Sequence, residues 1–489
     1  MTMESASFFA PQKQNGLSRG SAGIYAKIID YGLLALLVFS PLPAASVNEW
    51  SILVIQLMVL VMMTAYVLMR EKPRPDESLS RALKWPKYLF MGSCIFLVIQ
   101  FIPFPKFLVK IFSPGAYTYL ENYAVNFSSD SYLSFSLIPS FTFQKALELV
   151  SCLFLGFLVL KTVTKRQQVV RIFYVLIAIG AFEAFYGLFE LYNTNPRILF
   201  YWKVYNLDSV TGTFVNRNHL SGFLEMILPL AVGLLIARID IFSFRNLSWR
   251  EKLLRFSERG LSKNLLIIFS IILMSLAIVF SKSRSGNFIL IFTFILFFAF
   301  TAIFFAMYDP RKKRVKKMLQ VLFVVIVIIT LYIGMDATLQ RFSMDKLLYE
   351  GRPTYWANTL RTFAEYPLFG TGLGTFGALY PAMANGDGPM ALVHAHNDYL
   401  EYLSELGLIG FLLLLGGILF LAVLSFSVWR TRKHPEIKGL ALGGIISLIA
   451  IFVHSLTDFN LHIPANMVLF SVILPLTVIM AFYKRGASS

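Results

Sequence analysis

The stretch NLLIIFSIILMSLAIVFSKSRSGNFILIFTFILFFAF, residues 264–300, decides the fold class of the chain. It holds two apolar runs separated by one short polar turn, and each run is long enough to cross about 30 Å of hydrocarbon as a helix. Similar runs recur along all 489 residues, of which 57% are hydrophobic and only 15% charged. Soluble globular proteins do not have this composition. The sequence therefore predicts an all-α integral membrane protein.

We predict twelve transmembrane helices. They fall at 24–43, 48–70, 86–104, 144–163, 168–192, 217–238, 264–281, 286–308, 318–335, 398–428, 439–459 and 464–483. The predicted organisation is a cytoplasmic tail at 1–23, helices one to nine within 24–335, a periplasmic loop with short helices at 336–397, helices ten to twelve within 398–483, and a cytoplasmic tail at 484–489.

The net charge of +17 reflects membrane topology. Most Lys and Arg residues fall on one side of the membrane if both termini are cytoplasmic, and the clearest case is DPRKKRVKK at 309–317. This asymmetry is the positive-inside rule. It gives little support to a nucleic-acid partner, and it places four segments outside, at 105–143, 193–216, 282–285 and 336–397.

The loop at 336–397 is the longest outside segment, and loops of this length are usually functional. We expect a helix that begins at Pro353 and ends before Pro367. The following GTGLGTFG resembles a glycine-rich nucleotide loop. It lacks the Lys and the Ser or Thr of a P-loop and follows no strand, so we predict neither nucleotide binding nor any other cofactor.

The segment HAHNDYLEYLSELGLIG, residues 394–410, places ionisable groups directly before an apolar run. Asp398 and Glu401 have the spacing of a helix-capping pair. His396 lies just before this helix start, where the helix dipole favours a neutral imidazole, and a neutral imidazole can act as a general base. The alternative is a histidine that hydrogen-bonds loop backbone. His394 is a second candidate, which we expect on another face.

Acidic residues repeat along the start of the tenth predicted span, at Asp398, Glu401 and Glu405. They form one helical face that should line a wet cavity or meet basic partners. We expect these partners to be three outward arginines, Arg217, Arg284 and Arg352. The planar guanidinium also suits phosphate oxygens, which favours an anionic substrate. The alternative is that each arginine extends to lipid headgroups.

Other polar residues lie within or beside the predicted spans. Glu183, Glu190 and Glu225 are expected to face the interior of the bundle. In HSLTDFNLHIPAN, residues 454–466, His454 and Asp458 are four residues apart and could pair. The roles of His454, Asp458 and His462 stay open. Because the sequence has no HExxH motif, we predict no metal site.

Several segments resemble blocks of the bacterial O-antigen ligase and O-antigen polymerase family of lipid-linked glycan transferases. The ligase pattern is a His followed by Asn, Ser or Gln, then nine residues, then Gly-x-x-Gly. His396, Asn397, Gly407 and Gly410 match this pattern. SRSG, GRPTYWANTL with YPLFGTGLGTF, and GTFVNRNHLSGFL also resemble family blocks, whereas residues 1–160 add only topology.

The resemblance implies a membrane glycosyltransferase that moves a glycan from undecaprenyl diphosphate to an acceptor hydroxyl, on lipid A core or on another glycan. It implies an inverting, metal-independent transfer at the periplasmic face of the bacterial inner membrane, in lipopolysaccharide or exopolysaccharide biosynthesis. His396 would be the catalytic base, and Arg284 and Arg352 would hold the diphosphate. The candidate substrate-binding residues are Arg217, Arg284, Arg352, Trp356, His394, Asn397 and Glu401.

Two alternatives remain beside the ligase. The first is a polymerase of the same family, which would add many repeat units. The second is a transporter or flippase of polyprenyl-linked glycans. A transporter usually carries charge near the membrane midplane. In this sequence the ionisable residues gather at one face, which favours an enzyme.

Overall fold

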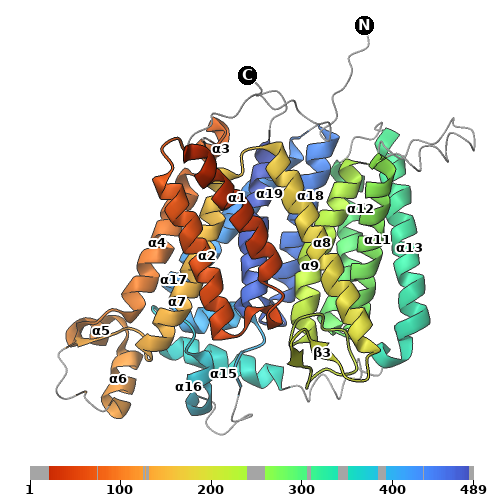
Figure 1. The fold of residues 1–489 in the computed structure, drawn as a ribbon. Helices are drawn as coiled ribbons and strands as arrows, with labels where there is room; N and C mark the ends of the chain where they lie inside the picture. The colour runs from red at the N-terminus through yellow and green to blue at the C-terminus, as the bar shows by residue number, and fades with distance from the viewer. Residues whose placement is uncertain are drawn as a thin grey trace, which may run out of the picture.

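In the residues that it describes, the computed structural model has twelve long helices, and each overlaps one predicted span (Figure 1). The described residues are 21–73, 75–124, 127, 132–238, 259–304, 310–339, 351–383, 392–432 and 434–483. The long helices are α1 (Ser21–Phe39), α2 (Glu49–Leu68), α4 (Lys84–Phe101), α7 (Pro139–Thr162), α8 (Arg166–Leu191), α9 (Arg217–Ala237), α11 (Arg259–Phe280), α12 (Arg284–Phe304), α13 (Pro310–Leu339), α17 (Asp398–Arg430), α18 (Pro435–His454) and α19 (Pro464–Phe482).

Within the described residues, nine helices are long and apolar enough to cross a membrane. The prediction of an all-α multi-pass membrane protein is therefore confirmed. The predicted number of twelve spans and the predicted sidedness stay predictions.

The centre of the bundle is formed by α9, α18 and α19. In the most apolar 18-residue stretch of α9, 100% of the residues are buried, and in that of α19, 94% are buried. A side chain at Gly233 of α9 would collide with Gly439 and Gly443 of α18, so these glycines allow the two backbones to touch. Small residues at such crossings are the usual means of close helix packing in membranes.

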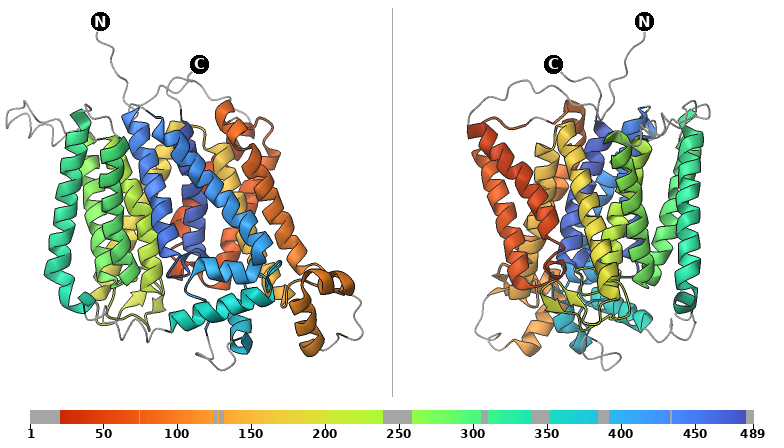
Figure 2. Two further views of the ribbon diagram at one scale, coloured as in Figure 1. Left: turned by 180° about the vertical axis from the view of Figure 1, so that it is seen from behind. Right: turned by 45° about the vertical axis from the view of Figure 1, so that its right-hand side comes forward.

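Most short elements gather at one end of the bundle, which we call the loop face (Figures 1 and 2). They are β1 (Phe104–Pro105), α5 (Lys106–Phe112), α6 (Pro114–Tyr123), β2 (Tyr132–Leu133), β3 (Arg197–Ile198), β4 (Tyr201–Trp202), α15 (Arg352–Glu365) and α16 (Phe376–Met383); β1 pairs with β2 and β3 with β4, both antiparallel. The opposite end carries α3 (Glu77–Ala82), and two 3-10 turns, η1 (Ala44–Ser46) and η3 (Asn460–His462), complete the fold.

The predicted outside segments agree with this arrangement in their described parts, because the short elements of 105–143, 193–216 and 336–397 share the loop face. The predicted helix of the long loop is α15, with Pro353 in its first turn. Parts of that loop, at 340–350 and 384–391, lie outside the described residues. The same holds for the predicted tails, apart from residues 21–23.

The first part of α17 is set apart from the rest by a break at Gly407, which has a left-handed backbone (φ 61°). Figure 2 shows this first part lying across the end of the bundle before the helix turns and runs through it. The glycine-rich turn packs into the break, because Thr371 N–H donates to Ser404 O at 3.0 Å and Gly372 N–H donates to Glu405 O at 3.0 Å. The turn that resembles a nucleotide loop is thus a packing element against α17.

Candidate active site at the loop face

Thr457 lies in the connection between α18 and α19. It forms hydrogen bonds with the first turns of α15 and α12. Arg352 Nη1, at the start of α15, donates to Thr457 O at 2.7 Å. The hydroxyls of Ser285, in the first turn of α12, and Thr457 are 2.9 Å apart. Arg284 is the residue before Ser285 and the first residue of α12. One predicted substrate arginine, Arg352, therefore contacts Thr457, and a second, Arg284, is next to a residue that does.

Asp458, the next residue, contacts side chains at the start of α9 and just before α17. Its side chain is 1% exposed, and Oδ2 accepts from Asn218 Nδ2 at 2.7 Å. His396 Nδ1 lies 3.2 Å from Oδ1, and His219 Nε2 lies 3.8 Å from the same oxygen. Burial alone would raise the pKa of Asp458, but the nearby imidazoles of His219 and His396 hold it well below its usual range. Asp458 is thus a buried carboxylate beside a histidine ring.

His396 is held in an uncommon backbone conformation, with φ at 52°. The next residue, Asn397, caps α17: its side chain accepts from Leu400 N–H at 3.1 Å and donates to Leu456 O at 2.9 Å. The His396 side chain is 27% exposed. A carboxylate only accepts hydrogen bonds, so Asp458 favours the tautomer with the proton on Nδ1 and the lone pair on Nε2. Such a ring can accept a proton from a substrate.

A second cluster lies beside this pair. His394 Nδ1 is 2.7 Å from Glu401 Oε1, and His462 Nδ1 is 2.7 Å from Asp398 Oδ1. Ala395 N–H donates to Glu401 Oε2 at 2.7 Å. Burial alone would lower the pKa of His462, but Glu401 and the hydrogen bond to Asp398 outweigh burial and raise it to about 9. These contacts describe a buried, charged network at the start of α17.

This network corrects two expectations. Asp398 and Glu401 are not a capping pair, because Asn397, one residue earlier, supplies the cap and leaves both carboxylates to bind other partners. We expected arginines as the basic partners of this helical face. The contacts of Asp398 and Glu401 are made instead by His394, His462 and backbone N–H groups.

The two histidines of HAH meet at one aromatic ring. His394 stacks on Phe459 with ring centroids 4.1 Å apart, and His396 contacts the same ring edge-on at 4.9 Å. His219 contacts it edge-on at 4.5 Å. Although we expected His394 on another face, it packs one ring away from His396. Phe459 therefore fixes the spacing of three imidazoles.

Each predicted arginine is the first residue of its helix: Arg217 of α9, Arg284 of α12 and Arg352 of α15. Arg352 contacts Thr457 itself, while the residues next to Arg217 and Arg284 contact Asp458 and Thr457. A helix N-terminus carries partial positive charge and unpaired N–H groups, which favour anions. Three such termini gather around the Thr457–Asp458 segment.

Residues 269–415 match the family model described as O-antigen ligase. The resemblance to the O-antigen ligase and polymerase family is confirmed. No curated protein matches the chain. The matched part of the chain thus resembles membrane enzymes of the O-antigen ligase and polymerase type.

The matched region of the ligase family contains most of the site predicted from sequence. It holds Arg284, Arg352, Trp356, His394, His396, Asn397 and Glu401. Arg217 and the Thr457–Asp458 segment lie outside it. The fold therefore completes the site with parts of the chain that the matched region does not include.

Trp356 supports the histidine segment through one hydrogen bond. Its indole Nε1 donates to Ala395 O, between the two histidines, at 3.1 Å. Contact of Trp356 with a substrate stays a prediction, as does the substrate role of the other predicted residues. The expectation that the site needs no metal also stays a prediction.

His454 and Asp458, whose spacing would allow them to pair, have different partners. His454 Nδ1 is 2.8 Å from Glu225 Oε2, and Asp458 pairs with His396 instead. The helix α18 ends at His454, so the four-residue spacing no longer places both side chains on one helical face. The expectation that Glu183, Glu190 and Glu225 face the bundle interior is confirmed, because all three are buried.

Sequence reasoning assigned no role to several residues that contact the site. They are Asn218, His219, Thr457, Asp458, Phe459 and His462. The available signal was the polar density of HSLTDFNLHIPAN after an apolar run. The missing information was tertiary, because only the fold brings this segment against the start of α17.

Proposed function

We propose that this ligase-family protein transfers a glycan from undecaprenyl diphosphate to an acceptor hydroxyl at the loop face, which would face the periplasm. One observation carries the proposal. A partly exposed histidine, His396, is oriented by the buried carboxylate Asp458, and helix N-termini that begin with arginine gather around the same segment. The arrangement joins a base to an anion-binding surface.

The proposed step is a single displacement. His396 Nε2 takes the proton of the acceptor hydroxyl as the hydroxyl oxygen forms a bond to the anomeric carbon of the glycan. The bond from that carbon to the diphosphate oxygen breaks, and the diphosphate leaves with the electron pair. Because the nucleophile enters opposite to the leaving group, the anomeric configuration inverts. A general base of this kind contributes about 10²- to 10⁴-fold in rate.

Arg284 and Arg352 are proposed to bind the diphosphate and to stabilise the charge that develops on it. Charge-assisted hydrogen bonds are worth about 1.5–3 kcal/mol each. Donors that are already in position where charge develops are the larger part of such catalysis. The position of both residues at helix N-termini adds to the attraction for an anion.

We favour a ligase over a polymerase slightly, and the product distinguishes them. The experiment is reconstitution of purified protein with an undecaprenyl-diphosphate oligosaccharide and a lipid A core acceptor, read by mass spectrometry. A single transfer to the core supports a ligase, and a ladder of repeat units supports a polymerase. The His396→Ala variant should lose about 10²- to 10⁴-fold in rate in either case. Transfer by this variant at the wild-type rate would show that His396 is not the base.

A further inference from the structure

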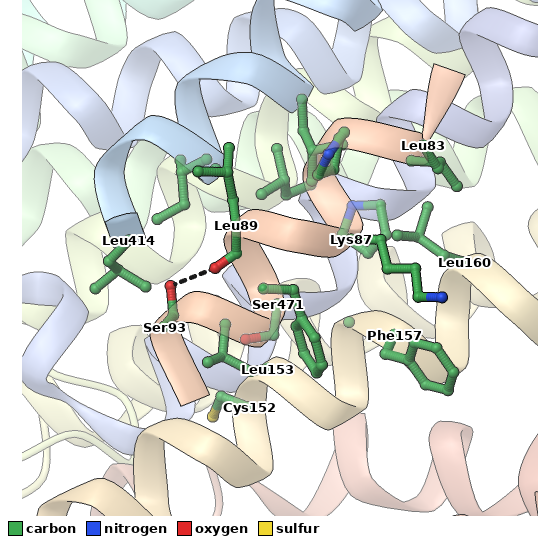
Figure 3. Close-up of a pocket in the computed structure, with 18 of the residues that line it drawn as sticks. Leu83, Lys87, Leu89, Ser93, Cys152, Leu153, Phe157, Leu160, Leu414 and Ser471 are labelled. Atoms are coloured by element: carbon green, nitrogen blue, oxygen red, sulfur yellow. Dashed lines mark hydrogen bonds between the residues drawn. The ribbon is translucent and has the colours of Figure 1, made fainter. Parts of the chain in front are cut away.

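A cavity of about 1100 Å³ lies between α4, α7, α17 and α19 (Figure 3). Apolar side chains such as Leu89, Leu153, Phe157, Leu160 and Leu414 form most of its wall. Its volume lies slightly above the range for pockets that hold drug-sized ligands, about 300–1,000 Å³. Protein interiors rarely leave such a space unfilled, because the lining atoms lose their packing contacts.

Three of the four hydroxyl groups in this wall already have partners within the protein. Ser93 Oγ donates to Leu89 O at 2.9 Å, as Figure 3 shows, and Ser471 Oγ donates to Met467 O at 2.7 Å. The Tyr402 hydroxyl donates to Leu461 O at 3.0 Å. The interior of the cavity therefore suits hydrocarbon chains and offers little to a polar ligand.

The end of the cavity opposite to the loop face is basic. Four of the five charged residues that line the cavity are Arg81, Lys84, Lys87 and Lys161, and the fifth, Glu77, lies 3.5 Å from Arg81. Within the described part of the chain, Lys84, Lys87 and Lys161 form no ion pair with a carboxylate. Arg81, Lys84 and Lys87 are exposed, so this end of the cavity reaches the surface.

We propose that this cavity binds one anionic phospholipid from the leaflet opposite to the loop face. Its acyl chains would fill the apolar interior, and its phosphate would lie among Lys84, Lys87 and Lys161. Charge complementarity selects an anionic headgroup over a zwitterionic one, and basic pockets between membrane helices commonly bind such headgroups. The proposal rests on the proposed function only in that the donor diphosphate is placed at the loop face.

The position of the basic end argues against the glycan donor as the occupant. In the proposed reaction the diphosphate of the donor lies at the loop face, beside His396, whereas the lysines lie at the other end of the bundle. One diphosphate cannot occupy both places. The inner end of the cavity does approach the site, because Tyr402 lines the cavity and stacks on His462 with ring centroids 4.2 Å apart.

Native mass spectrometry of the full-length protein in detergent tests the proposal, with phosphatidylglycerol and phosphatidylethanolamine added in equal amounts. We expect one retained phosphatidylglycerol per protein. The preference for phosphatidylglycerol over phosphatidylethanolamine should fall about fivefold for each basic residue removed. The double variant Lys84→Glu with Lys87→Glu should therefore abolish this preference. Arg70→Glu with Lys72→Glu is the matched control, because these residues are in the preceding loop and do not line the cavity.

A second pair of variants tests the apolar part. A Cβ atom at Gly417 would lie 3.7 Å from Leu89 Cβ, so Gly417→Leu should fit into the cavity and reduce retention of both lipids. Gly416→Leu is the control, because no atom lies within 4 Å of a Cβ there and Gly416 does not line the cavity. Equal retention of the two lipids, or equal effects of the variants and their controls, would overturn the proposal. Displacement of phosphatidylglycerol by an equal amount of undecaprenyl phosphate would also overturn it.

Discussion

Two histidine–carboxylate pairs in this protein have the same chemistry and different surroundings. In the pair of His396 and Asp458, the two atoms are 3.2 Å apart and the imidazole is 27% exposed. In the pair of His454 and Glu225 they are 2.8 Å apart, and the side chains are 0% and 1% exposed. A substrate can therefore reach the first pair and not the second.

The difference shows that exposure, more than residue type, separates a candidate base from a structural contact. The buried pair joins α18 to α9, where loss of one partner would leave a polar or charged group without compensation. The exposed pair joins the start of α17 to the segment after α18 and leaves one side of an imidazole open. His454 and Asp458 are only four residues apart in the chain. Because α18 ends at His454, the first residue belongs to the buried structural pair and the second to the candidate base pair.

The largest effect on stability is expected at the buried pair. His454→Ala should lower the free energy of unfolding by about 3–5 kcal/mol, because Glu225 would be left buried without its partner. The measurement is the thermal unfolding midpoint of the purified protein in detergent.

A double variant serves as the control for this comparison. His454→Leu with Glu225→Leu removes both polar partners and should recover most of the lost stability, as replacement of a buried pair by apolar residues often does. A midpoint of the single variant equal to that of the wild type would mean that the pair is not structural.

An intermediate effect is expected from pH, through His462. Its pKa is raised from about 6.5 to about 9 in the folded protein, so its contribution is complete below about pH 6.5 and is lost as the pH rises through 9. The resulting loss in the free energy of unfolding is at most about 3 kcal/mol. The thermal midpoint of the wild type should fall between pH 6.5 and 10, and His462→Gln should remove most of this slope. A variant with the same slope as the wild type would contradict the assignment.

The smallest effect is expected from a change that keeps the charge. Arg284→Lys retains a cation at the start of α12 but loses the planar fork, which should weaken donor use about tenfold through a higher KM. Steady-state transfer kinetics measure this change. Arg361→Lys, at an exposed position of α15, is the control. Equal KM values for the two variants would count against diphosphate binding by Arg284.

The sequence was sufficient for the parts of the fold that depend on local pattern. The lengths of the apolar runs predicted the all-α membrane class, and Pro353 marked the start of α15. The position of His396 before a helix predicted a site at the start of α17. These features can be read locally because hydrophobic length, proline and helix caps act over a few residues.

The remaining features of the site depend on contacts between distant segments. The pairing of His396 with Asp458 joins residues 62 positions apart, and helical spacing alone favoured His454 as the partner. The break at Gly407 depends on the close approach of the turn at Gly370. The ligase pattern contained Gly407, but only the structure gives the reason for a glycine there.

The most direct test of the account is a double-mutant cycle on His396→Ala and Asp458→Asn, measured as the transfer rate of purified, reconstituted protein. If Asp458 acts by orienting His396, each single variant is slow and the double variant is no slower than His396→Ala, because there is no longer a base to orient. Asp458→Asn should also change the pH dependence of the rate. The account would be contradicted if the rate losses of the two single variants multiplied in the double variant. A wild-type rate in Asp458→Asn would also contradict it.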